Sequence, residues 1–146
     1  MSNLNQQSQP PQAAVDQIIG LYNQGQLKQT VSLSESLAKQ YPNAVILYDI
    51  LGAADMALKN NEKSIEIYQN ALQLNPNHID AYNNIGNIFL TQGKLEEAIE
   101  AYNKAIYIKT EYAEANNNIG IEIKAQTSLT HFTFHSKWDS HCNWRG

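Results

Sequence analysis

Paired asparagines recur along this chain, and their side-chain amides could hydrogen-bond another polypeptide. The stretch "NNIG" occupies 83–86 and appears again at 117–120, 34 residues later. An amide side chain offers donors and an acceptor, the groups that an extended peptide also presents along its backbone. With neighbouring polar residues, the asparagines form a predicted peptide-binding set: Asp49, Asp80, Asn83, Asn84, Asn87, Asn117 and Asn118.

Imidazole and thiol groups gather near the C-terminal end of the sequence. His131, His135, His141 and Cys142 carry groups that are good zinc ligands. Their spacing matches no standard zinc site, and nothing supplies the paired ligands that hold a structural zinc. We therefore expect no metal and no cofactor, and we interpret 127–146 as an irregular tail outside the repeats.

No arrangement of side chains predicts catalysis. Glu96 and Glu97 lie early in an expected helix, where carboxylates favour the positive end of the helix dipole. His78 is expected to be a hydrogen-bonded surface imidazole rather than a base. The sequence contains no glycine-rich phosphate loop and no nucleophile elbow. The chain is predicted not to be an enzyme.

A 34-residue repeat predicts the elements that must position these side chains. Tyr48, Leu51 and Gly52 align with Tyr82, Ile85 and Gly86, and Tyr68 and Ala71 align with Tyr102 and Ala105. The frame divides the chain into copies at 11–44, 45–78 and 79–112 and a partial copy at 113–126. Upstream, the polar start at 1–10 is predicted to be a disordered tail.

Within each copy the apolar spacing is helical. Tyr82, Ile85, Gly86 and Phe89 follow the i, i+3, i+4, i+7 pattern. "TQGK" at 91–94 places a glycine where one helix must stop and the chain must turn. Each copy is therefore predicted to be a pair of antiparallel helices of about 14 residues, followed by a proline that cannot continue the helix.

These residues resemble the tetratricopeptide repeat family. Its pattern of aromatic-x2-Leu-Gly-x2-Tyr, then Ala-x3-Phe, then Pro is matched by a series of residues in the third copy: Tyr82, Ile85, Gly86, Phe89, Ala98 and Tyr102. The resemblance covers roughly residues 11–125. It implies an all-α fold, a right-handed superhelix of antiparallel helix pairs whose first helices line a concave groove.

The sequence departs from the family pattern at several positions. Thr30 and Ser34 stand where small and aromatic residues are expected, and Thr110 replaces the usual proline. Asp55 replaces the aromatic residue that Phe89 supplies one copy later. This alignment puts a carboxylate on the packing face, where burial without a partner is costly.

The predicted groove changes character along the chain. The repeated asparagines look like the asparagine ladder of the O-linked N-acetylglucosamine transferases, which grips backbone amides, although asparagine is also a common consensus residue in such repeats. Upstream, the equivalent face is apolar and is bordered by Asp16 and Asp49: Val15, Ile19, Ile50 and Ala53. The family's carboxylate clamp needs lysine and arginine that are missing here, so a carboxylate-terminated chaperone tail is not the expected ligand.

Composition restricts the function further. A net charge of −4 and a pI near 5.5 leave no basic stripe for nucleic acid. No run approaches the roughly 20 apolar residues needed to cross a bilayer, and no secretory signal opens the chain. The single cysteine fits a reducing compartment, so a cytoplasmic protein is expected.

Two function classes stay open. The first is a scaffold that binds a peptide or partner protein in the groove. The second is the leading, non-catalytic repeat segment of a larger glycosyltransferase- or sulfotransferase-like enzyme. The abrupt loss of the repeat after 126 also suggests a truncated or rearranged reading frame. The oligomeric state stays open.

Overall fold

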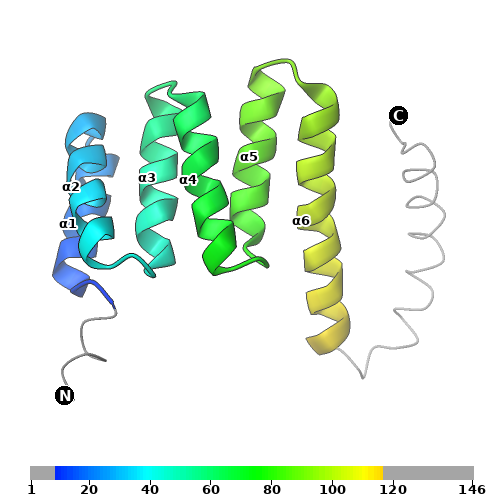
Figure 1. Cartoon of the computed structure of the whole chain (residues 1–146), viewed down its shortest axis with the longest axis horizontal. Helices are drawn as coiled ribbons and strands as arrows, with labels where there is room; N and C mark the ends of the chain where they lie inside the picture. Colours follow the sequence, from blue (N-terminus) through cyan, green and yellow to red (C-terminus); the bar gives the residue numbers. More distant parts are fainter. Residues whose placement is uncertain (1–8, 117–146) are drawn as a thin grey trace. The chain divides into compact units, whose positions relative to one another are not determined.

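The computed structural model describes residues 9–116, and this part of the chain is entirely helical, without strands. It contains six helices (Figure 1): α1 Gln12–Asn23, α2 Leu27–Gln40, α3 Val45–Ala57, α4 Asn61–Leu74, α5 Ile79–Thr91 and α6 Leu95–Asn116. The predicted all-α fold of helix pairs is confirmed. The chain divides into a first unit that ends at Ile106 and a second that begins at Tyr107. Of the second unit, only the helical segment 107–116 is described.

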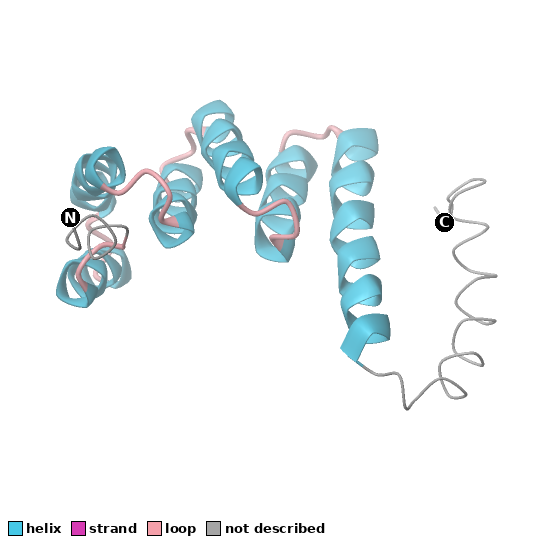
Figure 2. Ribbon diagram, turned by 60° about the horizontal axis from the view of Figure 1, so that its bottom comes forward, coloured by secondary structure: helices cyan, strands magenta, loops and turns pink. Residues whose placement is uncertain are grey.

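A residue with a positive φ angle follows the first helix of each pair. Gly25 and Gly93 have φ angles of 76° and 77°, and Lys59, at the equivalent position of the second pair, has φ 69°. Their backbone N–H groups donate to carbonyls in the last turn of the preceding helix, at 2.9 to 3.1 Å. Short loops then join successive helices (Figure 2). The glycine predicted to stop the helix at 93 is confirmed, and Lys59 adopts the same conformation without being glycine.

Consecutive helices of the first unit pack on one another from α1 to α5, and α1 also packs on α3. Buried apolar side chains form two clusters along this series. The first contains Ile18, Leu37, Ala44 and Leu47, and the second contains Tyr68, Ala81, Ile85, Ile88 and Ala101. The helical spacing in the sequence thus generates a core that runs through the first unit.

Two glycines lie where a tyrosine of the next helix crosses closely. A β-carbon added at Gly52 would lie 2.8 Å from Cζ of Tyr68, and one added at Gly86 would lie 2.7 Å from Cε1 of Tyr102. Both distances are too short for carbon atoms in contact. Gly52 and Gly86 thus allow the neighbouring helix to approach closely.

In the first helix pair the large side chain lies on the first helix and the small one on the second, the reverse of the second pair. Ile18 and Ser34 occupy the positions that Gly52 and Tyr68 take one copy later, and both are fully buried. A large side chain on α1 therefore compensates for a small one on α2. Thr30 is also buried, and its hydroxyl donates to the Gln26 carbonyl at 2.8 Å. The first copy is thus a repacked repeat.

Helix α6 runs on past the expected boundary between copies. We expected a copy to end at 112 and a separate helix to begin at 113, but α6 continues from Leu95 to Asn116. Thr110 stands where a proline would end the helix, so nothing interrupts the backbone hydrogen bonds. The remainder of the partial copy, the tail at 127–146 and most of the expected tail at 1–10 lie outside the described residues.

Candidate functional site

A hollow of about 180 Å³ opens between α1 and α3, on the face where the sequence predicts the groove. It will be called the α1–α3 hollow. Its lining combines four apolar or aromatic side chains with one carboxylate: Ile19, Tyr22, Ile50, Ala53 and Asp49. Ile19 is exposed, and the others are half-buried. The structure thus brings together three of the four residues that the sequence assigned to an apolar upstream groove.

Two residues of α1 differ from the expected groove lining: Val15 is absent from it and Tyr22 is part of it. Val15 is only 6% exposed and does not line the hollow, so its assignment to the groove face was wrong. Helix α1 packs on both α2 and α3, and this packing encloses Val15. Tyr22 was missed, although its spacing of three residues from Ile19 places it on the same helical face. Helical spacing from Ile19 is the signal that could have found it.

The side chain of Asp49 is hydrogen-bonded to His78, which directly precedes α5. Its Oδ1 accepts a hydrogen bond from Nε2 of His78 at 2.6 Å. Burial raises the pKa of Asp49 above its usual value, and this effect outweighs the lowering by His78. His78 is hydrogen-bonded as predicted, but it is half-buried rather than a free surface group. The pair fixes the α3 carboxylate at the edge of the hollow.

The hydroxyl of Tyr68 is buried near this pair. Tyr68 is 1% exposed, and its hydroxyl oxygen has no hydrogen-bond partner of acceptable geometry within the described range 9–116. Burial raises the pKa of this hydroxyl, and the charge of Asp49 raises it further, whereas the Asn84 amide opposes the shift. The ring crosses α3 at Gly52, so a polar group from α4 reaches the side where Asp49 and Asn84 lie.

The polar residues of α5 have different surroundings. Asp80, in the first turn, and Asn87 are exposed, whereas Asn83 and Asn84 are half-buried. The hydroxyl of Tyr102 donates a hydrogen bond to Oδ1 of Asn87. Asn87 therefore supports the half-buried tyrosine that crosses Gly86, a role that the sequence did not indicate. Asn117 and Asn118 lie outside the described residues.

Within 9–116, positive charge is confined to the second helix of each pair and to the turns, whereas both helices carry carboxylates. Within their bounds, α1, α3 and α5 contain no lysine or arginine. They carry aspartates instead, of which Asp16, Asp49 and Asp80 are at least partly exposed. Lysines occur on α2, α4 and α6 and in the turns. The helices that hold the predicted binding set are therefore acidic.

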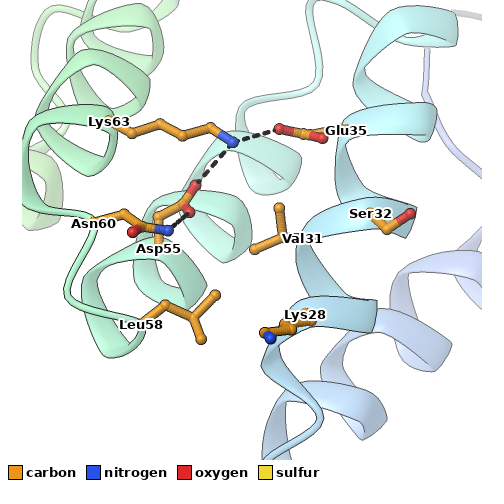
Figure 3. A pocket seen from close by; sticks show the side chains of 8 residues that line it. All are labelled: Lys28, Val31, Ser32, Glu35, Asp55, Leu58, Asn60 and Lys63. Atoms are coloured by element: carbon orange, nitrogen blue, oxygen red, sulfur yellow. Dashed lines mark hydrogen bonds and ion pairs between the residues drawn. The ribbon is translucent and has the colours of Figure 1, made fainter.

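A second hollow, of about 380 Å³, lies between α2, α3 and α4 (Figure 3). Its lining is a mixture of charged, polar and aliphatic side chains: Lys28, Val31, Ser32, Glu35, Asp55, Leu58, Asn60 and Lys63. Lys63 Nζ lies 2.7 Å from Oε1 of Glu35 and 3.9 Å from Oδ2 of Asp55. One copy later, Phe89 replaces Asp55 and lines the corresponding hollow.

Asp55 lies on the packing face, as the repeat frame predicts. The residue is 1% exposed. Its Oδ1 accepts a hydrogen bond from Nδ2 of Asn60 at 3.0 Å. Its Oδ2 is buried and makes no hydrogen bond to any residue from 9 to 116. Oδ1 is therefore hydrogen-bonded, whereas Oδ2 has only the 3.9 Å ion pair with Lys63.

Metal binding and membrane crossing can be assessed for the described residues. In 9–116, no three His, Cys, Asp or Glu side chains come together in a way that could hold a metal ion. The histidines at 131, 135 and 141 and Cys142 lie outside this range. None of the described helices is long and apolar enough to span a bilayer.

Known proteins share this arrangement of helices. The tetratricopeptide repeat family matches residues 42–111. No curated protein matches the chain. A solved structure of MamA (MamA MSR-1 C2) superposes with a TM-score of 0.65 at 22% identity, over 69% of this chain and 58% of the MamA chain. This chain therefore spans less than two thirds of MamA.

Two further structures are similar. The second TPR of Spaghetti (RPAP3), bound to the HSP90 peptide SRMEEVD, has a TM-score of 0.64 at 16% identity, over 73% of this chain and 95% of that one. The Yersinia enterocolitica type III secretion translocator chaperone SycD has a TM-score of 0.66 at 16% identity, over 81% and 86%. Identities this low show the fold alone. The tetratricopeptide repeat model thus matches residues 42–111, and the solved structures share the helical repeat fold of this chain.

Proposed function

We propose that this chain is a non-catalytic scaffold that binds an extended segment of a partner protein along α1, α3 and α5. The observation that carries the proposal is the α1–α3 hollow, an apolar depression next to the polar residues of α5. A side chain of the partner would enter the hollow with its apolar part, and the partner's backbone would follow the amides of Asn83 and Asn84. Such a combination of a pocket with polar anchors is typical of peptide recognition.

The similar structures support this proposal by analogy. RPAP3 is a repeat protein bound to a peptide, and SycD is a chaperone for translocators. The likeness of the α5 asparagines to the ladder of the O-linked N-acetylglucosamine transferases points the same way. The side chain of Asn83 makes no hydrogen bond or ion pair to other residues in 9–116, so its amide is available to a ligand.

A capture experiment with a blocked hollow tests the proposal. The full chain is immobilised as the wild type, as Ala53→Phe, which fills the hollow, and as Gln29→Phe, which adds the same side chain at an exposed position of α2. We expect bound peptides to be lost with Ala53→Phe and kept with Gln29→Phe. Equal capture by all three folded proteins would show that the hollow is not the binding site.

A further inference from the structure

The acidic character of α1, α3 and α5 indicates the charge of the segment that they would bind. Asp16, Asp49 and Asp80 occupy successive helices of this series, and these helices offer no lysine or arginine as partners. Asp16 accepts a hydrogen bond only from the neutral side chain of Gln12, at 2.9 Å, within the described residues. A ligand carrying negative charge would meet uncompensated repulsion here.

Asp49 is the member of this series that lines the α1–α3 hollow. It is half-buried, and among residues 9–116 only His78 hydrogen-bonds it, through Oδ1. Its second oxygen is therefore open to another donor. A hydrogen bond between a cation and a carboxylate is about twice as strong as one between neutral groups.

A second observation concerns the buried hydroxyl of Tyr68, which lies near Asp49. This hydroxyl makes no hydrogen bond of good geometry to residues in 9–116, and its polar neighbours are the Asp49 carboxylate and the Asn84 amide. Leaving a buried hydroxyl unpaired costs about 1 to 3 kcal/mol.

The lining of the α1–α3 hollow suits a long basic side chain. Ile19, Ile50 and Ala53 offer apolar surface to a methylene chain, and Tyr22 adds an aromatic ring beside Asp49. Lysine and arginine bury their stems on apolar surface while their charged ends stay at a polar edge. An aromatic face close to a cation adds further attraction.

We infer that the partner segment is basic, with a lysine or arginine whose stem lies in the α1–α3 hollow and whose charged end binds Asp49. Asp80 lies beyond Asp49 along the series and would meet a second basic residue of the same segment. This inference rests on the proposed function and adds the chemical class of the ligand. It is the opposite of an acidic peptide such as SRMEEVD, the ligand in the RPAP3 structure.

Selection from a displayed library of random dodecapeptides tests the inference. The full chain is used as the wild type, as Ala53→Phe and as the double variant Asp49→Asn with Asp80→Asn. Glu66→Gln, an exposed carboxylate on α4, serves as a control that removes one negative charge elsewhere. Clones retained by the wild type and lost with Ala53→Phe are the ligands of the hollow.

We expect these clones to be rich in lysine or arginine next to aliphatic residues, and their affinity to fall as salt rises. The double aspartate variant should bind them roughly tenfold or more weakly, and Glu66→Gln should bind them as the wild type does. Hollow-dependent clones that are neutral or acidic would overturn the inference and leave the scaffold function standing. If no clone depends on the hollow, the proposed function fails, and the inference fails with it.

Discussion

The ring of Tyr68 lies directly across Gly52, so that a β-carbon at Gly52 would come within 2.8 Å of Cζ. Gly86 has the same relationship with Tyr102, at 2.7 Å from Cε1. The surroundings differ, because Tyr68 is buried whereas Tyr102 is only half-buried and can shift toward solvent. Equal changes at the two glycines should therefore have unequal effects.

Gly52→Ala should destabilise the first unit, and Gly86→Ala should change its stability little. Overpacking a rigid core costs about 1 to 3 kcal/mol, whereas alanine gains about 1 kcal/mol over glycine in a helix. Gly20→Ala is the control, since nothing lies within 4 Å of the added carbon, and it should stabilise. Thermal unfolding of the three variants measures the differences. A stabilised Gly52→Ala would contradict the tight crossing.

Lys59→Gly should raise the free energy of unfolding. Lys59 holds a φ of 69° at the turn between α3 and α4. A left-handed conformation costs a residue with a β-carbon roughly 1 to 2 kcal/mol, and glycine avoids this cost. The reverse change, Gly93→Lys, at the equivalent turn should lower stability by a similar amount. Unfolding in urea measures both, and a neutral result for both would show that the turn stores no strain.

The repeat period predicted the helices and the turns because they depend on local residues and on one 34-residue frame. It did not predict how the first copy is packed, since the exchange of bulk between Ile18 and Ser34 involves two helices. The enclosure of Val15 likewise depends on the packing of α1 against two neighbours. These features depend on contacts between helices, and the 34-residue period alone does not specify those contacts.

The candidate site was predictable only in part for the same reason. The apolar residues of the α1–α3 hollow follow from helical spacing. The link between Asp49 and His78 joins residues 29 apart in the sequence, and no motif marks it. The hydrogen bond from Tyr102 to Asn87 needs a tyrosine rather than a phenylalanine at its position. The sequence shows that tyrosine, but its partner is visible only in the fold.

Asp55→Phe should stabilise the first unit. Asp55 lines a hollow of about 380 Å³ in which one oxygen of its carboxylate has no hydrogen bond to any residue in 9–116. Burying a phenylalanine contributes about 1.5 to 3 kcal/mol. The losses are roughly 1 kcal/mol for the Asn60 hydrogen bond and at most about 1 kcal/mol for the 3.9 Å ion pair with Lys63, and removal of the buried charge offsets part of them. Asp55→Asn is the control because it removes the charge and keeps the acceptor. A lower melting temperature for Asp55→Phe would show that the hollow cannot accept the ring.

Asp49→Asn should raise the melting temperature near neutral pH. Because burial raises the pKa of Asp49 in the folded state, the fold favours the neutral side chain. The stabilising contribution of that neutral form is complete below the usual aspartate pKa of about 4 and is lost as pH rises through the folded-state pKa. Asparagine stays neutral and still accepts the hydrogen bond from His78.

A pH series of thermal unfolding tests this prediction. The difference between Asp49→Asn and the wild type should be largest near neutral pH and should disappear below about pH 4. Glu66→Gln, at an exposed position on α4, is the control and should show no such trend. A variant that melts below the wild type near neutral pH would mean that the pairing of Asp49 with His78 outweighs its burial.

Replacing Asn83 and Asn84 by alanine should weaken the binding of an extended ligand while the first unit stays folded. Two net hydrogen bonds of about 0.5 to 1.5 kcal/mol each correspond to a loss of roughly tenfold or more in affinity. The side chain of Asn83 makes no hydrogen bond to other residues in 9–116, so its removal should not change stability. Asn84 contributes only through its position near Tyr68.

Asn87→Ala should behave differently, because it removes the acceptor of the Tyr102 hydroxyl and should lower the melting temperature. Affinity for a clone selected on the hollow and melting temperature, measured on the same preparations, separate a binding role from a structural one. If the double variant melts early and its folded fraction binds with unchanged affinity, the asparagines of α5 support the fold and not the ligand.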